Sequence, residues 1–222
     1  MAGLGVSVAG AQVVYSNNFE SGTAGLNVAA LTILPVTDVP AGPGSTFLGG
    51  FGNDFATLTL SGLTPRVPLE LAFVMFVGAT WDGNSTTFGP DSHRLLGDGV
   101  ALLNAMFLNI FPGEENLSEY TQCYSDATPT GPGSFAPFTG ADVAFMSGGI
   151  VDRYAICYFG HGAGDPVLTF TPTESIAELV FSGVGLQQTF DEFWAIDNVV
   201  VTAIPEPASA GLLLAGAPLL AP

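Results

Sequence analysis

A polar loop in the first half of the chain carries residues suited to binding a cation. It runs from Trp81-Asp82-Gly83-Asn84 to Gly89-Pro90-Asp91, which brings two carboxylates and an amide close together in sequence. Calcium takes oxygens of these types. The D-x-N spacing lacks the later Glu of an EF-hand, and Asp and Asn also build Asx turns. We therefore expect Asp82, Asn84 and Asp91 to form an Asx-turn loop, with a second metal site as the alternative.

The sequence contains no signature of an enzyme. There is no G-x-S-x-G, H-E-x-x-H or phosphate-binding glycine loop. The adjacent pairs Glu114-Glu115 and Asp191-Glu192 are poor acid and base pairs, because carboxylates next to each other in sequence do not usually face each other across a substrate. His93 and His161 are expected to be solvated loop residues. We therefore predict that the protein is not an enzyme.

The elements that must position these residues are short strands joined by tight turns. Period-two alternation over Phe55–Leu60 predicts a half-buried strand, and the apolar run Leu69–Val77 predicts a central strand covered on both faces. Gly97-Asp98-Gly99 predicts a hairpin with Asp-Gly at its turn. Ala177–Phe181 and Phe193–Ala203 are expected to form the closing pair. About ten strands and no convincing amphipathic helix predict an all-β fold, a jelly-roll β-sandwich in a single domain.

Two separated motifs resemble those of galactose-binding-like domains and several carbohydrate-binding modules, which are jelly-roll sandwiches. One is Asn18-Phe19-Glu20 after the first strand, Gln12–Tyr15, and the other is Trp194-Ala195-Ile196-Asp197-Asn198-Val199. The resemblance implies that the first and last strands lie side by side and that Glu20 and Asp197 bind a structural calcium ion. Calcium takes about 6–8 oxygen ligands, including backbone carbonyls. The alternative is that Glu20 caps a turn and Asp197 stabilises its neighbour's backbone.

Both ends of the chain carry features of exported proteins. Ala9-Gly10-Ala11 fits a signal-peptidase site, so residues 1–11 are expected to be the remnant of a signal peptide. Pro205-Glu206-Pro207 and the apolar segment after it resemble the PEP-CTERM sorting signal of bacterial envelope proteins, which implies processing by an exosortase-type enzyme. The basic cluster of that signal is absent, and the segment is shorter than the ~20 residues of a membrane-spanning helix. Residues 204–222 are thus expected to be a shortened sorting segment behind a β-sandwich domain of residues 12–203.

Composition limits the partners. The chain has 3 basic and 20 acidic residues, a formal net charge of −17. Such a surface repels phosphate groups, so we expect no nucleic-acid binding and membrane contact only through the C-terminal segment before processing. In an exported chain the two cysteines, Cys123 and Cys157, are expected to form a disulfide. The alternative is two small buried side chains.

Together these features predict an exported, non-catalytic protein of the bacterial cell envelope or extracellular matrix, built as a calcium-stabilised sandwich. The alternative is a carbohydrate-binding module that recognises exopolysaccharide. An open groove lined with exposed Trp or Tyr would favour that alternative, and two facing carboxylates in a cleft would favour a hydrolase. Trp81 is expected to close an edge of the core, although such a side chain can also stack on a sugar.

Overall fold

The computed structural model describes residues 10–28, 33–35, 46–109, 121–124, 135–141, 151–156 and 168–204. Every named element in these ranges is a strand, and no helix within them is long and apolar enough to cross a membrane. The strands are β1 (Gln12–Asn17), β2 (Leu26–Val28), β3 (Ile33–Pro35), β4 (Thr46–Phe51), β5 (Phe55–Ser61), β6 (Leu69–Ala79), β7 (Ser92–Gly97), β8 (Val100–Met106), β9 (Val151–Ile156), β10 (Leu168–Phe170), β11 (Ile176–Val184) and β12 (Glu192–Ala203).

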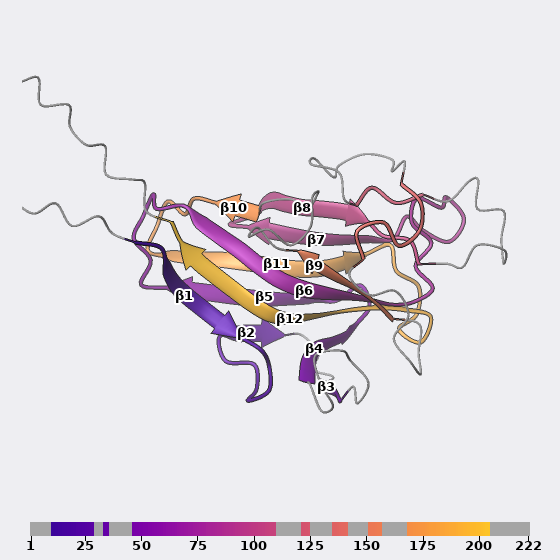
Figure 1. Ribbon diagram of the computed structural model, residues 1–222, viewed down its shortest axis with the longest axis horizontal. Helices are drawn as coiled ribbons and strands as arrows, with labels where there is room; N and C mark the ends of the chain where they lie inside the picture. Colours follow the sequence, from indigo (N-terminus) through magenta and orange to yellow (C-terminus); the bar gives the residue numbers. More distant parts are fainter. Residues whose placement is uncertain are drawn as a thin grey trace, which may run out of the picture.

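The strands form two antiparallel sheets (Figure 1). One sheet has the order β10-β6-β12-β4-β3, with β1 also paired to β12 and β9 to β6, and the other has the order β2-β5-β11-β7-β8. The long strands β6 and β12 pair with each other at the centre of the first sheet. On its other edge β6 pairs with β9 and β10, and β12 pairs with β1 and β4. The predicted fold class, an all-β jelly-roll sandwich, is confirmed.

Aromatic side chains cover both faces of β6. Phe73 of β6 meets Phe181 of β11 edge to face, with ring centroids 5.2 Å apart. Phe76 points to the other face of β6, where it stacks on Phe47 of β4 at 4.8 Å. All four rings are buried. The prediction that Leu69–Val77 is a central strand covered on both faces is therefore confirmed.

The first and last strands are neighbours, as the jelly-roll resemblance implied. β1 pairs antiparallel with β12, from Gln12 opposite Ala203 to Asn17 opposite Val199. The expectation that the last two strands form a closing pair is wrong, because β11 lies between β5 and β7 in the five-stranded sheet and β12 lies in the other. In a sandwich, consecutive strands often cross from one sheet to the other, and no local pattern marks that crossing.

Three connections meet at one end of the sandwich, which we call the loop end. They join β4 to β5, β6 to β7 and β11 to β12. β6 ends where β12 begins, because Ala79 is opposite Glu192. The Asn53 side chain, between β4 and β5, donates to Leu186 O at 2.6 Å and accepts from Leu186 N–H at 3.0 Å. The loop end is thus tied together by contacts between residues that are far apart in sequence.

Candidate cation sites

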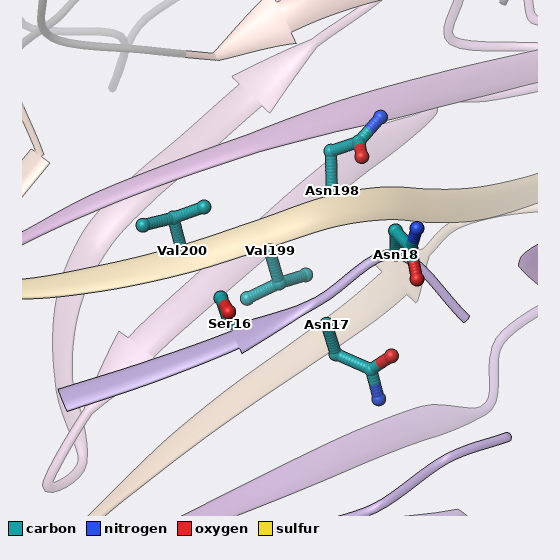
Figure 2. A pocket seen from close by; sticks show the side chains of 6 residues that line it. All are labelled: Ser16, Asn17, Asn18, Asn198, Val199 and Val200. Atoms are coloured by element: carbon teal, nitrogen blue, oxygen red, sulfur yellow. The ribbon is translucent and has the colours of Figure 1, made fainter. Parts of the chain in front are cut away.

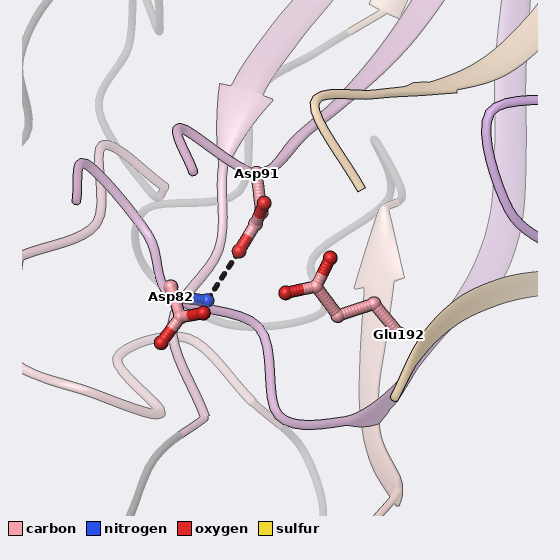
Figure 3. A group of neighbouring side chains, drawn as sticks. All are labelled: Asp82, Asp91 and Glu192. Atoms are coloured by element: carbon pink, nitrogen blue, oxygen red, sulfur yellow. Dashed lines mark hydrogen bonds between the residues drawn. The ribbon is translucent and has the colours of Figure 1, made fainter. Parts of the chain in front are cut away.

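Three carboxylates meet beneath the loop end. Asp82 follows β6, Asp91 directly precedes β7, and Glu192 begins β12. One oxygen from each lies within 4.8 Å of the other two, and all three side chains are buried. Figure 3 shows the carboxyl group of Glu192 directed toward Asp82 and Asp91. We call these residues the acidic triad.

In two triad members, one carboxyl oxygen accepts a hydrogen bond from a backbone N–H and the other does not. Asp91 Oδ2 accepts a hydrogen bond from Asp82 N–H, and Glu192 Oε2 accepts one from Gln187 N–H. Asp91 Oδ1 and Glu192 Oε1 are buried without a hydrogen-bond partner. Leaving a buried polar atom unsatisfied costs about 1–3 kcal/mol, and more when it is charged. These two oxygens therefore indicate a ligand or a shared proton.

Burial and mutual repulsion favour protonation of the triad. Burial raises the pKa of Asp91; the Asp82 N–H opposes the rise, and the charges of Glu192 and Asp82 add to it. Burial also raises the pKa of Glu192, and the charges of Asp82 and Asp191 contribute in the same direction. The charged groups that act on these two pKa values are all acidic. Within the described residues, no basic side chain neutralises Asp91 or Glu192.

The structure brings Asp82 and Asp91 together but uses Asn84 elsewhere. Asn84 Oδ1 accepts from Thr121 N–H at 2.7 Å, and Asn84 N–H donates to Thr121 O at 2.9 Å. The loop also contains a turn, in which Ser85 N–H donates to Asp82 O at 3.1 Å. The sequence singled out Glu192 only as the neighbour of Asp191, because only the pairing of β6 with β12 brings it to this loop. Its one signal is a charged residue at the start of an apolar strand.

A second acidic site lies where β1 ends beside β12. Asp197 is only 4% exposed, and its Oδ1 accepts from Asn198 N–H at 2.7 Å. Glu20 is exposed, and its Oε1 accepts from Thr46 N–H at 2.7 Å. Burial raises the pKa of Asp197 to about 6; the Asn198 N–H lowers it, and the charge of Glu20 raises it. Glu20 thus lies close enough for its charge to act on Asp197.

A pocket of about 380 Å³ opens where β1 ends beside β12, and its lining includes Asn198, the residue after Asp197 (Figure 2). Its lining comes from the end of β1 and the middle of β12: Ser16, Asn17, Asn18, Asn198, Val199 and Val200. Three of the six side chains are amides, and amide oxygens suit a hard cation. Two of these oxygens also accept a backbone hydrogen bond, Asn17 Oδ1 from Phe19 N–H at 2.8 Å and Asn18 Oδ1 from Glu20 N–H at 3.4 Å. We call this pocket, together with Glu20 and Asp197, the β1–β12 junction. The hydrogen bond from Asn198 N–H to Asp197 also fits the alternative expectation, in which Asp197 stabilises its neighbour's backbone.

Both tryptophans are core residues. Trp81 is completely buried, donates its Nε1–H to Phe193 O at 3.1 Å and packs edge-on against Phe107. Trp194 is also completely buried and donates its Nε1–H to Gly52 O at 2.9 Å. The expectation that Trp81 closes the core is confirmed, and neither indole is available to a sugar.

The expectation of a solvated His93 is wrong. His93 lies on β7 and is completely buried against Phe73, Phe181 and Trp194. Neither ring nitrogen has a hydrogen-bond partner. Burial lowers the pKa of His93 to about 3. The side chain is therefore neutral at physiological pH.

Other predicted residues lie outside the described ranges. Cys157 is one of them, so the disulfide stays a prediction; Cys123 is buried, and its Sγ accepts from Met106 N–H at 2.8 Å. Residues 1–9, His161 and the motif Pro205–Pro207 also lie outside them. The export and sorting predictions therefore remain predictions.

Comparisons with known proteins add little to these sites. No protein-family model matches the chain, and no curated protein matches it. Among solved structures, the CBM22-1 xylan-binding domain of Paenibacillus barcinonensis Xyn10C is 8% identical, with a TM-score of 0.41, over 90% of this chain and 99% of that one. The K1 cleaved adhesin domain of Lys-gingipain from Porphyromonas gingivalis W83 is 12% identical, with a TM-score of 0.40, over 85% and 97%. The CBM22-1–GH10 modules of Clostridium thermocellum Xyn10B are 13% identical, with a TM-score of 0.39, over 86% and 29%. Because these identities and TM-scores are low, the assignment of the fold rests on the strand pairing of this chain itself.

Proposed function

We propose that the protein is an exported, non-catalytic module of the bacterial cell envelope or extracellular matrix, with a structural calcium ion at the β1–β12 junction. The observation that carries the calcium proposal is the pairing of β1 with β12, which brings the end of the first strand to Asp197. Asp197 is buried beside Asn198, one of three amide side chains that line the pocket, and the charge of Glu20 acts on it. An ion held there joins the two terminal strands of the sandwich.

The non-catalytic part of the proposal rests on the access to the acidic triad. Asp91 and Glu192 are facing carboxylates, the arrangement that would favour a hydrolase if it lay in a cleft. Both side chains are completely buried, however. A general acid or base must reach hydrogen-bonding distance of its substrate, and these carboxyl groups have no surface to offer one. They support a structural role.

The proposed location rests on the sequence of the two ends. Ala9-Gly10-Ala11 and Pro205-Glu206-Pro207 are the motifs that imply export and processing by an exosortase-type enzyme. The acidic composition fits the calcium proposal, because a net charge of −17 attracts divalent cations. The C-terminal segment would contact the membrane only until it is processed.

Removing the junction carboxylates tests the calcium proposal. A cation that binds only the folded state adds about 2.7 kcal/mol at a hundredfold excess over Kd. For a domain of this size that corresponds to a rise of about 5–10 °C in Tm. In Glu20→Gln/Asp197→Asn we expect this contribution to be lost, while the amide oxygens still accept from Thr46 N–H and Asn198 N–H.

Thermal melts of the full chain in calcium and in chelator provide the measurement. The matched control is Asp54→Asn/Glu174→Gln, which removes the same two charges at exposed positions. It should keep the full calcium response. A junction variant whose Tm rises with calcium as much as that of the wild type would show that no ion binds at the junction.

Exposed phenylalanines at the loop end favour carbohydrate binding as a second function. Phe190 is 80% exposed, Phe55 50% and Phe88 46%. The connections that carry two of them adjoin, because Gln187 Nε2 donates to Phe88 O at 3.3 Å. Aromatic rings at a surface offer an apolar face beside polar loops. These rings, and not the buried tryptophans, would dock on exopolysaccharide.

Affinity electrophoresis of the full chain in gels that contain exopolysaccharide tests this second function. We expect the wild type to be retarded and Phe88→Ala/Phe190→Ala to lose at least tenfold in affinity, which corresponds to about 1.4 kcal/mol. Val100→Ala/Ile176→Ala, at the opposite end of the sandwich, also removes two exposed apolar side chains and should be retarded like the wild type. Equal mobility of the wild type with and without polysaccharide would refute the carbohydrate-binding function.

A further inference from the structure

The acidic triad concentrates more negative charge than the described part of the protein compensates. Asp91 and Glu192 are completely buried, and Asp82 is 7% exposed. The chain contains no Lys and only three Arg. Of these, Arg94 lies on β7 near the triad in sequence, but it is exposed and donates to Asn104 Oδ1 at 3.0 Å. Burying unpaired charge costs several kcal/mol per ion, so the unsatisfied carboxyl groups of Asp91 and Glu192 require a partner.

Two unsatisfied oxygens point independently to a ligand. Asp91 Oδ1 and Glu192 Oε1 have no hydrogen-bond partner although their side chains are completely buried. The Glu192 side chain is aimed at the other two carboxylates (Figure 3). In a folded protein nearly all buried polar atoms are satisfied. Each of the two carboxyl groups is therefore oriented by a backbone N–H at one oxygen, while its other oxygen is left without a partner.

The spacing of the three carboxylates fits one coordination sphere. Two oxygens that ligate the same calcium ion at about 2.3–2.6 Å are at most about 5 Å apart. One oxygen of each triad member lies within 4.8 Å of the other two. Magnesium keeps much of its water and prefers a rigid octahedron of oxygens, which a buried cluster of three carboxylates accommodates less readily.

We propose that the acidic triad is a second cation site, which binds calcium through Asp82, Asp91 and Glu192. The ion joins both ends of the β6–β7 connection to the first residue of β12. It thereby fastens together the connections that carry Phe88 and Phe190. This site is separate from the β1–β12 junction and does not depend on the function proposed above.

The competing explanation is a shared proton. Two facing carboxyl groups can hold one proton between them and need no metal. The variant Asp91→Asn/Glu192→Gln separates the two explanations, because its amides mimic the protonated groups. Each amide keeps an oxygen for the N–H of Asp82 or Gln187, so the fold should be retained. A cation site is destroyed by this change, whereas a proton-sharing pair is reproduced.

Isothermal titration of the full chain with calcium is the experiment. We expect Asp91→Asn/Glu192→Gln to lose one binding event that the wild type and the charge-matched Asp54→Asn/Glu174→Gln retain. Glu20→Gln/Asp197→Asn should keep that event, so a failure of the junction site and a failure of the triad site give different results. An Asp91→Asn/Glu192→Gln variant that binds as many calcium ions as the wild type, with the same Kd, would overturn the proposal.

Proteolysis supplies a second readout that reports on the loops directly. Chymotrypsin cleaves after exposed aromatic residues, and Phe88 and Phe190 are exposed at the loop end. In the wild type we expect calcium to slow cleavage there at least fivefold relative to chelator. The single variant Glu192→Gln, which serves if the double variant does not fold, should be cleaved at the same rate in both. A wild type cleaved equally fast with and without calcium would also overturn the proposal.

Discussion

His93 is buried, and the protonation of its ring in the unfolded state makes the free energy of unfolding depend on pH. Its ring lies between the sheets with neither nitrogen hydrogen-bonded, and burial lowers its pKa to about 3. The unfolded chain has a histidine pKa near 6.5. Below that pH the unfolded state binds a proton that the folded state refuses, so the free energy of unfolding falls as the pH falls from about 6.5 toward 3.

Replacing His93 with leucine tests this assignment. The wild type should lose about 2.5 kcal/mol more than His93→Leu between pH 7.5 and pH 4.5, because each pH unit below 6.5 corresponds to 1.36 kcal/mol. At pH 7.5 the two proteins should differ by less than about 1 kcal/mol, since leucine removes a buried donor that has no acceptor. The raised pKa values of Asp91, Glu192 and Asp197 act in the opposite direction in both proteins.

Urea unfolding in the presence of chelator at the two pH values provides the measurement. The comparison uses the difference between the two proteins, so that the carboxyl groups cancel. Equal losses of stability in the wild type and His93→Leu would mean that His93 is protonated in the folded state or accessible to water.

Local sequence patterns predicted the burial of a single residue only where its neighbours in sequence determine that burial. Trp81 was correctly placed in the core because a large aromatic ring beside a polar loop most often closes an edge. His93 was misplaced because it sits between Asp-Ser and Arg, which read as loop, while its partners Phe73, Phe181 and Trp194 come from distant strands. The position of Glu192 beside Asp82 and Asp91 was not predicted, for the same reason. Contacts between residues far apart in sequence determine the positions of both side chains.

At the scale of elements, the strands and turns followed from local chemistry. The predicted hairpin turn is confirmed: Asp98 and Gly99 connect β7 to β8 with φ of 48° and 80°, the left-handed values of a type I′ turn. The central strand β6 and the pairing of β1 with β12 were also predicted. The assignment of β11 and β12 to different sheets was not, because strand order depends on contacts that no local period encodes.

Close approach between strands is another feature that only the structure supplies. A Cβ added at Gly49 of β4 would lie 1.8 Å from the Cβ of Ala195 on β12. These two strands therefore pack with small residues opposite each other, next to the register shift between Trp194 and Ala195. In sequence, Gly49 lies in a glycine-rich stretch typical of a turn, and nothing there distinguishes a strand glycine from a loop glycine.

At the scale of the whole molecule, charge links the two proposed sites. A net charge of −17 destabilises a compact state by self-repulsion. Two calcium ions would neutralise four of those charges, one ion where the terminal strands meet and the other beneath the loop end. Both sites join segments that are far apart in sequence. Calcium would then act as a cross-link in a sandwich that has few basic residues to pair with its acids.

The most direct test of this account is the number of calcium ions bound by the folded full chain, measured by native mass spectrometry from a calcium-containing solution. The account predicts two ions per chain, one lost in Glu20→Gln/Asp197→Asn and the other in Asp91→Asn/Glu192→Gln. The charge-matched Asp54→Asn/Glu174→Gln should retain both. A wild type that carries no calcium, or that carries ions which neither pair of substitutions removes, would contradict it.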